Sequence, residues 1–383
     1  MTKLAATPPM GWNSWNQFGS KVDQDSVLAM AKLMVSQGYR ELGYQYVVID
    51  DCWSEKQRDS LGNLVPDKER FSEGIAALAK EVHGLGLKLG IYSDAAEKTC
   101  ASYLGSLGFE DQDAKTWAGW GVDFLKYDYC FAPPDQASAI ERYTKMGDAL
   151  KASGREILYS LCEWGGRAPH LWGRQAGGQM WRATGDLFDT WVDVWVTPAN
   201  FYGIGVDSAF DLAARIAPYG GPGGWNDLDM LVVGLKGKGQ IHGGGLAGLE
   251  YRTHMTLWSL ACSPLMMGCD LRNLDDYSAS LLKNPEVLAV NQDALGIPGR
   301  RARQWGSCEA WLKPLSDGSV AVALFNRGGQ GADIELRASD IGLKDSSKSV
   351  RDLWALADAG ELGESRSFRV QPHESLLFKV ASR

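Results

Sequence analysis

Short apolar runs alternate with longer amphipathic stretches between residues 44 and 268, and this rhythm constrains the fold more than any other feature of the chain. Runs rich in apolar and β-branched residues predict strands, and strands separated by helices predict a parallel sheet. The predicted strands cover residues 10–12, 46–50, 87–93, 123–128, 157–161, 180–183, 225–229 and 264–268. Helices are predicted at residues 26–37, 74–84, 113–120 and 137–152, where apolar residues recur about every 3.6 positions. Eight strand–helix units predict an α/β fold of the (β/α)8 TIM barrel type.

The helical spacing ends near Pro298, and a different pattern follows. Alternating apolar and polar residues predict strands at residues 319–325, 333–336 and 367–370, and Gly, Asp and Ser lie between them. Such a pattern is typical of an antiparallel sheet. We therefore expect two domains: the (β/α)8 barrel at residues 1–297 and a C-terminal antiparallel β-sandwich at residues 298–383.

Charge and hydropathy argue against two classes of partner. The chain of 383 residues has a net charge of −8 and no cluster of Lys and Arg, so we expect no nucleic acid partner. It has no run of about eighteen apolar residues, so we expect no membrane span. The first residues lack the apolar core of a signal peptide, which predicts either a cytoplasmic protein or a mature chain whose leader was removed.

Polar side chains gather where the predicted strands end. These strand ends carry Asp50, Asp51, Asp94, Lys126, Asp128, Cys162, Glu163, Trp164, Arg182, Asp186 and Asp227. In a (β/α)8 barrel the carboxyl ends of the strands meet at one face, and active sites are built on that face. The sequence therefore predicts an active site formed by several strand ends.

The strand at residues 123–128 places a lysine and an aspartate together. Because side chains alternate along a strand, Phe124, Lys126 and Asp128 share one face, whereas Tyr127 and Tyr129 point to the other. A nearby ammonium group lowers the pKa of a carboxyl group and keeps it ionised, as a nucleophile requires. The alternative is a buried ion pair that only joins two strands.

Asp186 is the candidate for a second catalytic carboxyl group. Cleavage of a glycosidic bond requires one acid that protonates the leaving oxygen and a second carboxylate that captures or stabilises the sugar cation. Asp186 follows the strand at residues 180–183 at a turn that contains Gly185, from which its side chain can reach over a cleft. The alternative is an N-cap for a helix predicted at residues 187–194.

Eight motifs in order resemble glycoside hydrolase family 27, the melibiase-type α-galactosidases. They are PMGWNSW at 9–15, IDDCW at 49–53, LGIYSD at 89–94, KYD at 126–128, LCEWG at 161–165, WRATGD at 181–186, WNDLDML at 225–231 and PLMMG at 264–268. The β-rich tail also resembles the C-terminal domain of this family. The resemblance implies a retaining exo-α-galactosidase that acts on a small molecule or an oligosaccharide with terminal α-galactose.

The resemblance also implies roles for single residues. Asp128 matches the nucleophile and Asp186 matches the general acid/base. Sugar-binding positions are matched by Trp12, Asp50, Asp51, Lys126, Cys162, Trp164 and Arg182. The paired acids would bind the O4 and O6 hydroxyls, and an unpaired buried carboxylate would then disfavour the wrong epimer.

The family resemblance predicts a disulfide and no cofactor. Cys100 and Cys130 match a disulfide of the family, which favours a secreted or periplasmic mature chain. Cys52 matches a cysteine whose partner is missing from residues 16–24 of this chain. The seven cysteines form no C-x-x-C pair, and no metal or other cofactor is expected.

Several alternatives remain open at this point. Related members of the family act on β-L-arabinopyranosides or on α-N-acetylgalactosaminides, but Glu163 and Trp164 would leave no room for an acetamide, and the intact acid pair favours galactose. Glu97 departs from the family pattern, and Tyr129 is expected to narrow the cleft beside the nucleophile. Two other classes are a non-catalytic sugar-binding protein and a metal-dependent enzyme that would use Asp50, Asp51, Asp128 and Asp227.

Overall fold

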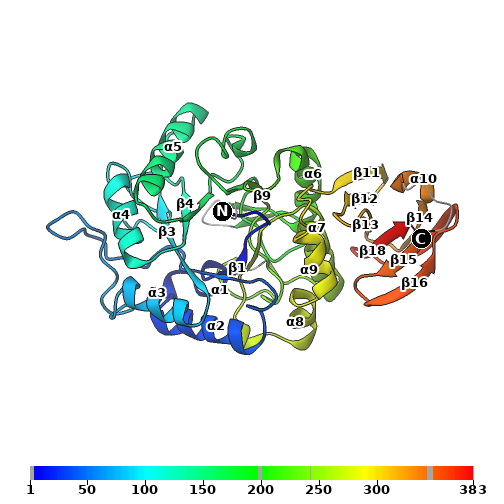
Figure 1. The fold of residues 1–383 in the computed structure, drawn as a ribbon, viewed down its shortest axis with the longest axis horizontal. Coiled ribbons are helices and arrows are strands. Elements are labelled where there is room, and N and C mark those ends of the chain that lie inside the picture. The colour runs from blue at the N-terminus through cyan, green and yellow to red at the C-terminus, as the bar shows by residue number, and fades with distance from the viewer. Residues whose placement is uncertain (1–3, 197–200, 242, 343–347, 383) are drawn as a thin grey trace.

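Eight parallel strands form one sheet in the first part of the chain (Figure 1). The computed structural model describes residues 4–196, 201–241, 243–342 and 348–382. The order of the strands in the sheet is β10-β1-β2-β3-β4-β5-β6-β9. The strands are β1 (Met10–Asn13), β2 (Tyr46–Val48), β3 (Lys88–Asp94), β4 (Phe124–Asp128), β5 (Leu158–Leu161), β6 (Met180–Arg182), β9 (Trp225–Asp227) and β10 (Leu265–Met267). Leu231, just beyond β9, forms a parallel bridge with Met267 and joins the two ends of the sheet. The (β/α)8 barrel expected from the sequence is confirmed.

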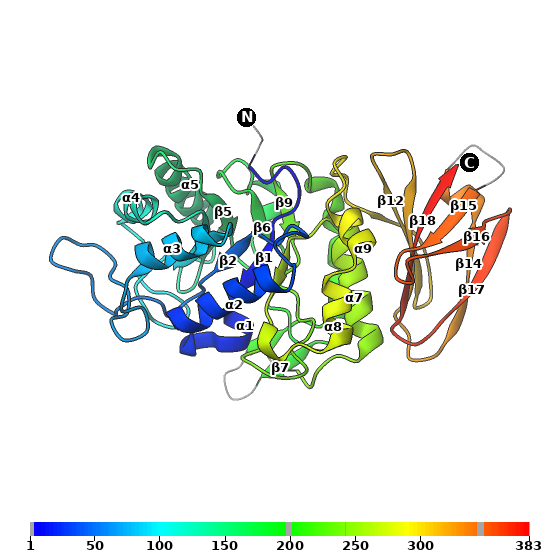
Figure 2. The ribbon, with the colours of Figure 1, turned by 60° about the horizontal axis from the view of Figure 1, so that its bottom comes forward.

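Helices surround the barrel (Figures 1 and 2). They are α1 (Trp15–Phe18), α2 (Gln24–Ser36), α3 (Ile75–Gly84), α4 (Glu110–Trp120), α5 (Gln136–Ala152), α6 (Val206–Ile216), α7 (Gly248–Leu260), α8 (Asp276–Leu282) and α9 (Pro285–Asn291). Local signals fix several helix ends. Asp23 caps α2 by accepting the Ser26 N–H at 2.7 Å, and α4 ends at Gly121 in the left-handed conformation, φ 84°.

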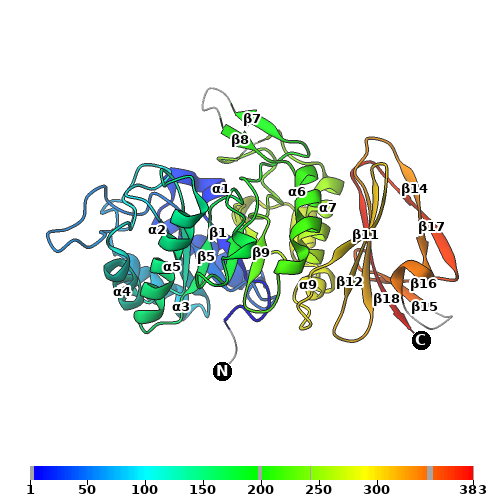
Figure 3. The same cartoon turned by 90° about the horizontal axis from the view of Figure 1, so that it is seen from above.

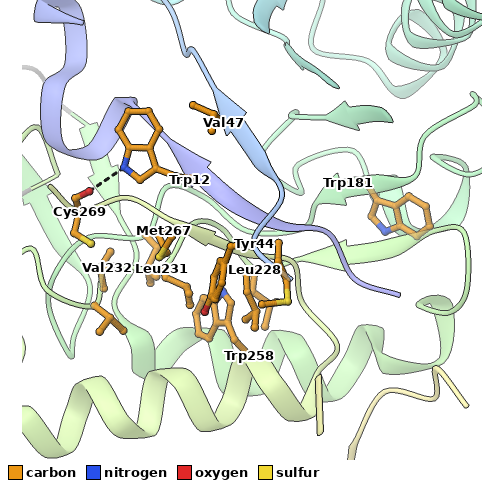
Figure 4. Close-up of a cluster of buried hydrophobic side chains, with 14 of the residues drawn as sticks. Trp12, Tyr44, Val47, Trp181, Leu228, Leu231, Val232, Trp258, Met267 and Cys269 are labelled. Carbon is orange, nitrogen blue, oxygen red and sulfur yellow. Dashed lines mark hydrogen bonds between the residues drawn. The ribbon is translucent and has the colours of Figure 1, made fainter. Parts of the chain in front are cut away.

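The barrel has an inner and an outer core. Tyr46, Phe124, Leu158, Met180 and Trp225 form the inner cluster, as expected for one face of each strand. The opposite strand faces pack against the helices in a second cluster, part of which is shown in Figure 4. This second cluster includes Tyr127 and Tyr129, so the alternation predicted for β4 is confirmed.

Residues 187–194 form no helix, so the helix prediction for this segment is wrong. After β6 the chain forms an irregular segment and a hairpin of β7 (Val194–Val196) and β8 (Phe201–Gly203), which projects from the barrel in Figure 3. Leu187 bridges Ile204, and the Asp189 carboxylate accepts the N–H groups of Gly237 and Leu246. These long-range hydrogen bonds satisfy the backbone and override the local apolar spacing.

The remaining chain forms antiparallel sheets that pack face to face, which confirms the expected β-sandwich. One sheet has the order β11-β12-β13-β18-β15-β16, and the other pairs β14 with β17. The strands are β11 (Arg300–Trp305), β12 (Cys308–Pro314), β13 (Val320–Asn326), β14 (Ala332–Arg337), β15 (Lys348–Asp352), β16 (Ala357–Glu361), β17 (Ser365–Val370) and β18 (Ser375–Ser382), with a short helix α10 (Ala338–Ile341). Val322, Leu324, Ile334 and Val380 belong to the apolar core between the sheets.

The described helices give no support for a membrane-spanning segment. None of them combines the length and the apolar character that crossing a bilayer requires.

Candidate active site

A cavity of about 550 Å³ opens among the carboxyl ends of the barrel strands. Its wall is formed by Trp15, Asn16, Asp50, Asp51, Tyr92, Cys100, Lys126, Asp128, Cys130, Phe131, Cys162, Trp164, Arg182, Asp186, Phe188, Asp229, Met230, Gln240 and Ile241. The structure thus brings together both candidate catalytic aspartates and six of the seven candidate sugar-binding residues. Only Trp12 is absent from the wall.

Asp128 is the last residue of β4, and its carboxylate is held from two sides. The Tyr92 hydroxyl donates a hydrogen bond to Oδ2 at 2.9 Å, and the N–H of Tyr129 donates to Oδ1 at 3.0 Å. Asp128 is only 5 % exposed. Its carboxylate is therefore fixed in direction at the base of the cavity, as a nucleophile must be.

Burial dominates the ionisation of Asp128. Loss of hydration raises the pKa of its carboxyl group to about 6, although the Lys126 ammonium acts in the opposite direction. The negative charge of Asp186 raises this pKa further, so the two carboxylates interact across the cavity. The lysine thus lowers the pKa of Asp128, as the sequence suggested, but burial outweighs it; at about 6 the carboxyl group is still mostly ionised at neutral pH.

A second buried acid lies next to Asp128. Asp94 ends β3 directly opposite Asp128 in the strand register. Its carboxyl oxygens accept the N–H groups of Ala96 at 2.8 Å and Cys130 at 2.9 Å. Burial, together with the neighbouring Asp128, raises the pKa of Asp94 to about 9. Burial and the neighbouring Asp128 therefore favour the neutral form of Asp94, which limits the negative charge beside Asp128.

Lys126 pairs with Asp50 and not with Asp128. The Lys126 ammonium lies 2.7 Å from Asp50 Oδ2, which also accepts a hydrogen bond from Asn13 Nδ2 at 2.8 Å. Asp51 is held by the Ala101 N–H, which donates to its Oδ2 at 2.9 Å. Both acids of the pair therefore line the cavity with fixed carboxylates, and the lysine links Asp50 to β4.

Arg182 connects Asp186 to a buried acid. Its Nη2 donates to Asp186 Oδ1 at 2.8 Å, and its Nη1 lies 2.9 Å from Asp229 Oδ1. The same Nη1 is 3.8 Å from the Cys162 sulfur. Burial raises the pKa of Asp229 to about 7 and Arg182 lowers it. Arg182 thus holds two carboxylates together, one in the interior and one at the mouth of the cavity.

Asp186 differs from Asp128 in its surroundings. Its side chain is 29 % exposed, and its partner is Arg182. Because the residues after it form no helix, the N-cap alternative is excluded, and the helix of this unit begins only at Val206. An acid at the rim of a cavity, in contact with water, is suited to exchange protons with a leaving group and with the solvent.

The structure places Trp12 away from the cavity. Its side chain is fully buried, and its indole N–H donates to the Cys269 carbonyl at 2.9 Å (Figure 4). Trp15 lines the cavity instead. A signal for Trp15 was available, because the strand predicted at residues 10–12 contains Trp12, and a residue beyond a strand end lies closer to the catalytic face than one inside the strand.

The segment after β5 contributes one large side chain to the cavity. Trp164 belongs to the wall, with the backbone in a left-handed conformation at φ 56°. Glu163 is buried elsewhere, and its Oε2 accepts the Arg167 N–H at 2.7 Å. Tyr129 stacks on Tyr143 at a ring distance of 5.6 Å and does not narrow the cavity. Bulk in this part of the wall therefore comes from Trp164 alone.

Sequence reasoning missed other wall residues besides Trp15. Tyr92 shares the inward face of β3 with Gly90 and Asp94, so strand alternation was a usable signal for it. Asp229 follows Asp227 by two residues and had the same signal. Phe188, Gln240 and Ile241 come from irregular loops, where no periodic pattern exists.

A disulfide joins Cys100 to Cys130 at the cavity wall, as the family resemblance predicted. Its Cα atoms are 5.1 Å apart, and it connects the loop after β3 to the loop after β4. The other five cysteines, Cys52 among them, are free and buried. The segment that follows Asp128 is therefore tied covalently to the neighbouring loop.

The acids of the metal-enzyme alternative do not gather into one ligand cluster. Within the described residues, one group has the spacing of metal ligands: Asp94, Cys100, Asp128 and Cys130. Its two cysteines form the disulfide and are not available as thiolates.

Comparisons with known proteins give one consistent result. The profile of the alpha galactosidase A family matches residues 7–293, and that of the alpha galactosidase C-terminal beta sandwich domain matches residues 306–380. An α-galactosidase of Cyamopsis tetragonoloba is 45 % identical over 382 residues, which cover 99 % of this chain and 87 % of the relative.

Solved structures agree over nearly the whole chain. Alpha-galactosidase I from Mortierella vinacea is 37 % identical with a TM-score of 0.93, and 99 % of this chain and 98 % of that chain are covered. The Saccharomyces cerevisiae α-galactosidase with raffinose is 30 % identical with a TM-score of 0.91, again with 99 % and 98 % covered. The chain therefore belongs to glycoside hydrolase family 27, the melibiase family of α-galactosidases.

Proposed function

We propose that the protein is a retaining exo-α-galactosidase that hydrolyses terminal α-D-galactosyl residues. The observation that carries this proposal is the pair of carboxyl groups in one cavity, of which Asp128 is buried and doubly hydrogen-bonded and Asp186 lies at the rim. Retaining glycosidases use two carboxyl groups in these different roles. The names of the family's relatives support galactose as the sugar.

In the first step, Asp128 attacks C1 of the galactosyl unit while Asp186 protonates the leaving oxygen. The C1–O bond breaks, a bond between C1 and Asp128 forms, and the alcohol departs with the proton of Asp186. The hydrogen bonds from Tyr92 and Tyr129 keep the attacking carboxylate pointed into the cavity. Their geometry supports attack without reorientation of the side chain.

In the second step, water replaces the enzyme at C1. The Asp186 carboxylate removes a proton from the water as it attacks, and the bond to Asp128 breaks. Two inversions at C1 restore the original configuration. Exposure of Asp186 to solvent supports its change from acid to base between the steps.

Recognition of galactose is assigned to the acid pair and to Trp164. Asp50 and Asp51 present buried carboxylates to the cavity, where an axial O4 and the O6 hydroxyl would complete their hydrogen bonds. A sugar without a hydroxyl there leaves a buried carboxylate unsatisfied. Trp164 occupies the wall with bulk that disfavours an acetamide.

We also propose that the substrates include oligosaccharides of the raffinose type. Support comes from the yeast relative, whose structure was determined with raffinose.

We further propose that the mature chain is secreted or periplasmic. The disulfide between Cys100 and Cys130 supports this location, because disulfides persist in oxidising compartments.

Chemical rescue with azide tests both catalytic roles. We expect Asp128→Ala and Asp186→Ala to lose turnover of α-galactosyl fluoride or a nitrophenyl α-galactoside by more than about 10³-fold. Azide added to Asp128→Ala replaces the nucleophile and yields β-galactosyl azide. Azide added to Asp186→Ala attacks the glycosyl-enzyme and yields α-galactosyl azide. The reverse assignment of products would contradict the proposed roles.

A panel of aryl glycosides separates the alternatives. The proposal expects the highest kcat/KM for the α-galactoside over the β-L-arabinopyranoside and the α-N-acetylgalactosaminide. Binding of galactose without hydrolysis by the wild-type protein would instead identify a sugar-binding protein.

A further inference from the structure

A second hollow adjoins the catalytic cavity. It has a volume of about 470 Å³ and is lined by Ala96, Glu97, Lys98, Leu107, Phe131, Ala132, Pro133 and Arg142. Phe131 belongs to the walls of both hollows. A ligand that fills the catalytic cavity and continues on this side would therefore pass the Phe131 ring before it reaches the second hollow.

Phe131 is held in an unfavourable state. Its apolar side chain is 73 % exposed, and its backbone has φ 56°, in the left-handed region that aromatic residues seldom adopt. Neither feature helps the protein fold, because the ring buries little surface and the backbone is strained. Strained residues of this kind concentrate at ligand sites. Phe131 also follows Asp128 by only three residues, next to the disulfide at Cys130.

One wall of the second hollow is held by contacts within the protein. The Glu97 carbonyl accepts the Gly105 N–H at 2.9 Å, and Lys98 forms an antiparallel bridge with Leu104. A Cβ atom at Gly105 would overlap the Ala96 carbonyl oxygen, so the loop is closed tightly around this residue. From α5, Arg142 Nη1 donates to the Ala95 carbonyl at 2.8 Å. On this side of the hollow the backbone is braced, so a ligand would be accommodated there by the side chains.

We propose that this second hollow is a subsite for a sugar on the leaving-group side of the substrate, with Phe131 as its stacking platform. Aromatic faces pack on the C–H faces of pyranose rings, and exposed charged side chains such as Glu97 and Lys98 bind hydroxyl groups. The hollow carries charges of both signs, which fits a neutral saccharide better than an anion. The proposal rests on the proposed function, since it concerns the remainder of the same substrate.

The test compares a substrate that reaches past the catalytic cavity with one that does not. Raffinose has two sugars beyond its galactose, whereas the leaving group of α-galactosyl fluoride is a single atom. We expect Phe131→Asn to lower the ratio of kcat/KM for raffinose to kcat/KM for the fluoride by about tenfold. Asparagine tolerates the left-handed backbone, so this variant removes the ring without adding strain. Phe131→Trp, which keeps an aromatic face, should preserve the ratio.

Leu61→Asn is the matched control. Leu61 is 78 % exposed and lines neither hollow, so its replacement should leave the ratio at the wild-type value. An unchanged ratio in Phe131→Asn, or an equal loss for both substrates, would overturn the subsite. Failure of the proposed function has a different signature, because the wild-type protein would then not hydrolyse the fluoride at all.

Discussion

Asp128 is buried and accepts a hydrogen bond from one side-chain hydroxyl group, and both features affect the pKa of its carboxyl group. Burial has the largest effect and raises the pKa of its carboxyl group to about 6, although the hydrogen bond from Tyr92 acts in the opposite direction. Below this pKa the carboxyl group is protonated and cannot attack, so kcat/KM should fall as the pH drops below about 6.

The variant Tyr92→Phe removes that hydroxyl donor and should shift the acid limb to higher pH. The ratio of variant to wild-type kcat/KM should be roughly threefold to tenfold lower near pH 5 than near pH 7. A pH profile of α-galactosyl fluoride hydrolysis measures this directly. Parallel profiles for the two proteins would show that Tyr92 does not influence the nucleophile.

Asp229 is the interior partner of Arg182, and its removal should cost stability. In Asp229→Asn the buried guanidinium, of which 4 % is exposed, loses its interior ion-pair partner at 2.9 Å. Breaking a buried pair typically costs about 3–5 kcal/mol in the free energy of unfolding, which urea titration measures. Asp333→Asn is the control, because Asp333 pairs with Arg369 at 3.3 Å on the surface and should change stability by less than about 1 kcal/mol. Equal effects would argue against a structural role of the interior pair.

The candidate site was predictable where residues belong to strands. Asp50, Lys126 and Asp128 follow from strand ends and alternation, and the structure brings all three to one cavity. Trp12, which lies inside β1, was predicted as a sugar-binding residue in place of Trp15, which lies beyond the end of this strand. The ion-pair partner of Lys126 could not be predicted from the sequence either, because its pairing with Asp50 depends on which strands become neighbours in space.

At the scale of elements, the buried strands were predicted well and the long connection after β6 was not. A buried parallel strand is recognised by a short apolar run bounded by polar residues. The predicted bounds of each of the eight strands therefore agree with the observed bounds within a few positions. The segment after β6 has apolar spacing that resembles a helix. Its structure depends instead on Asp189, whose carboxylate binds N–H groups about fifty residues away in the chain. No local pattern encodes such contacts.

The disulfide is the main covalent constraint on the loops that frame the cavity. Cys100 and Cys130 are 30 residues apart, and closure of a loop of that length should contribute about 3–4 kcal/mol to the free energy of unfolding. The double variant Cys100→Ser/Cys130→Ser should lose that amount in urea titration, and the wild-type protein treated with reductant should match it. A double variant as stable as the oxidised wild type would exclude this contribution.

At the scale of the whole molecule, the barrel and one face of the larger C-terminal sheet share an apolar cluster. Phe210 of α6 packs edge-on against Phe325 of β13 at a ring distance of 4.8 Å, and Trp311 of β12 lies beside both. Arg327 reinforces this junction by binding Asp207 of α6 at 2.7 Å. A shared core of this kind predicts that the two parts unfold together, since neither can separate without exposing aromatic surface.

Two buried cysteines report on the two parts separately. Cys308 is the only cysteine in the C-terminal sheets, and Cys269 lies in the barrel. Their reaction with a thiol reagent in increasing urea, followed by mass spectrometry, should show one common midpoint in the wild-type protein. Phe210→Ala removes the central ring and should lower the free energy of unfolding by about 3–5 kcal/mol. Both midpoints should then move together to lower urea. Reaction of Cys308 well before Cys269 in the wild-type protein would instead mean that the C-terminal sheets unfold independently and that the junction at Phe210 does not couple them.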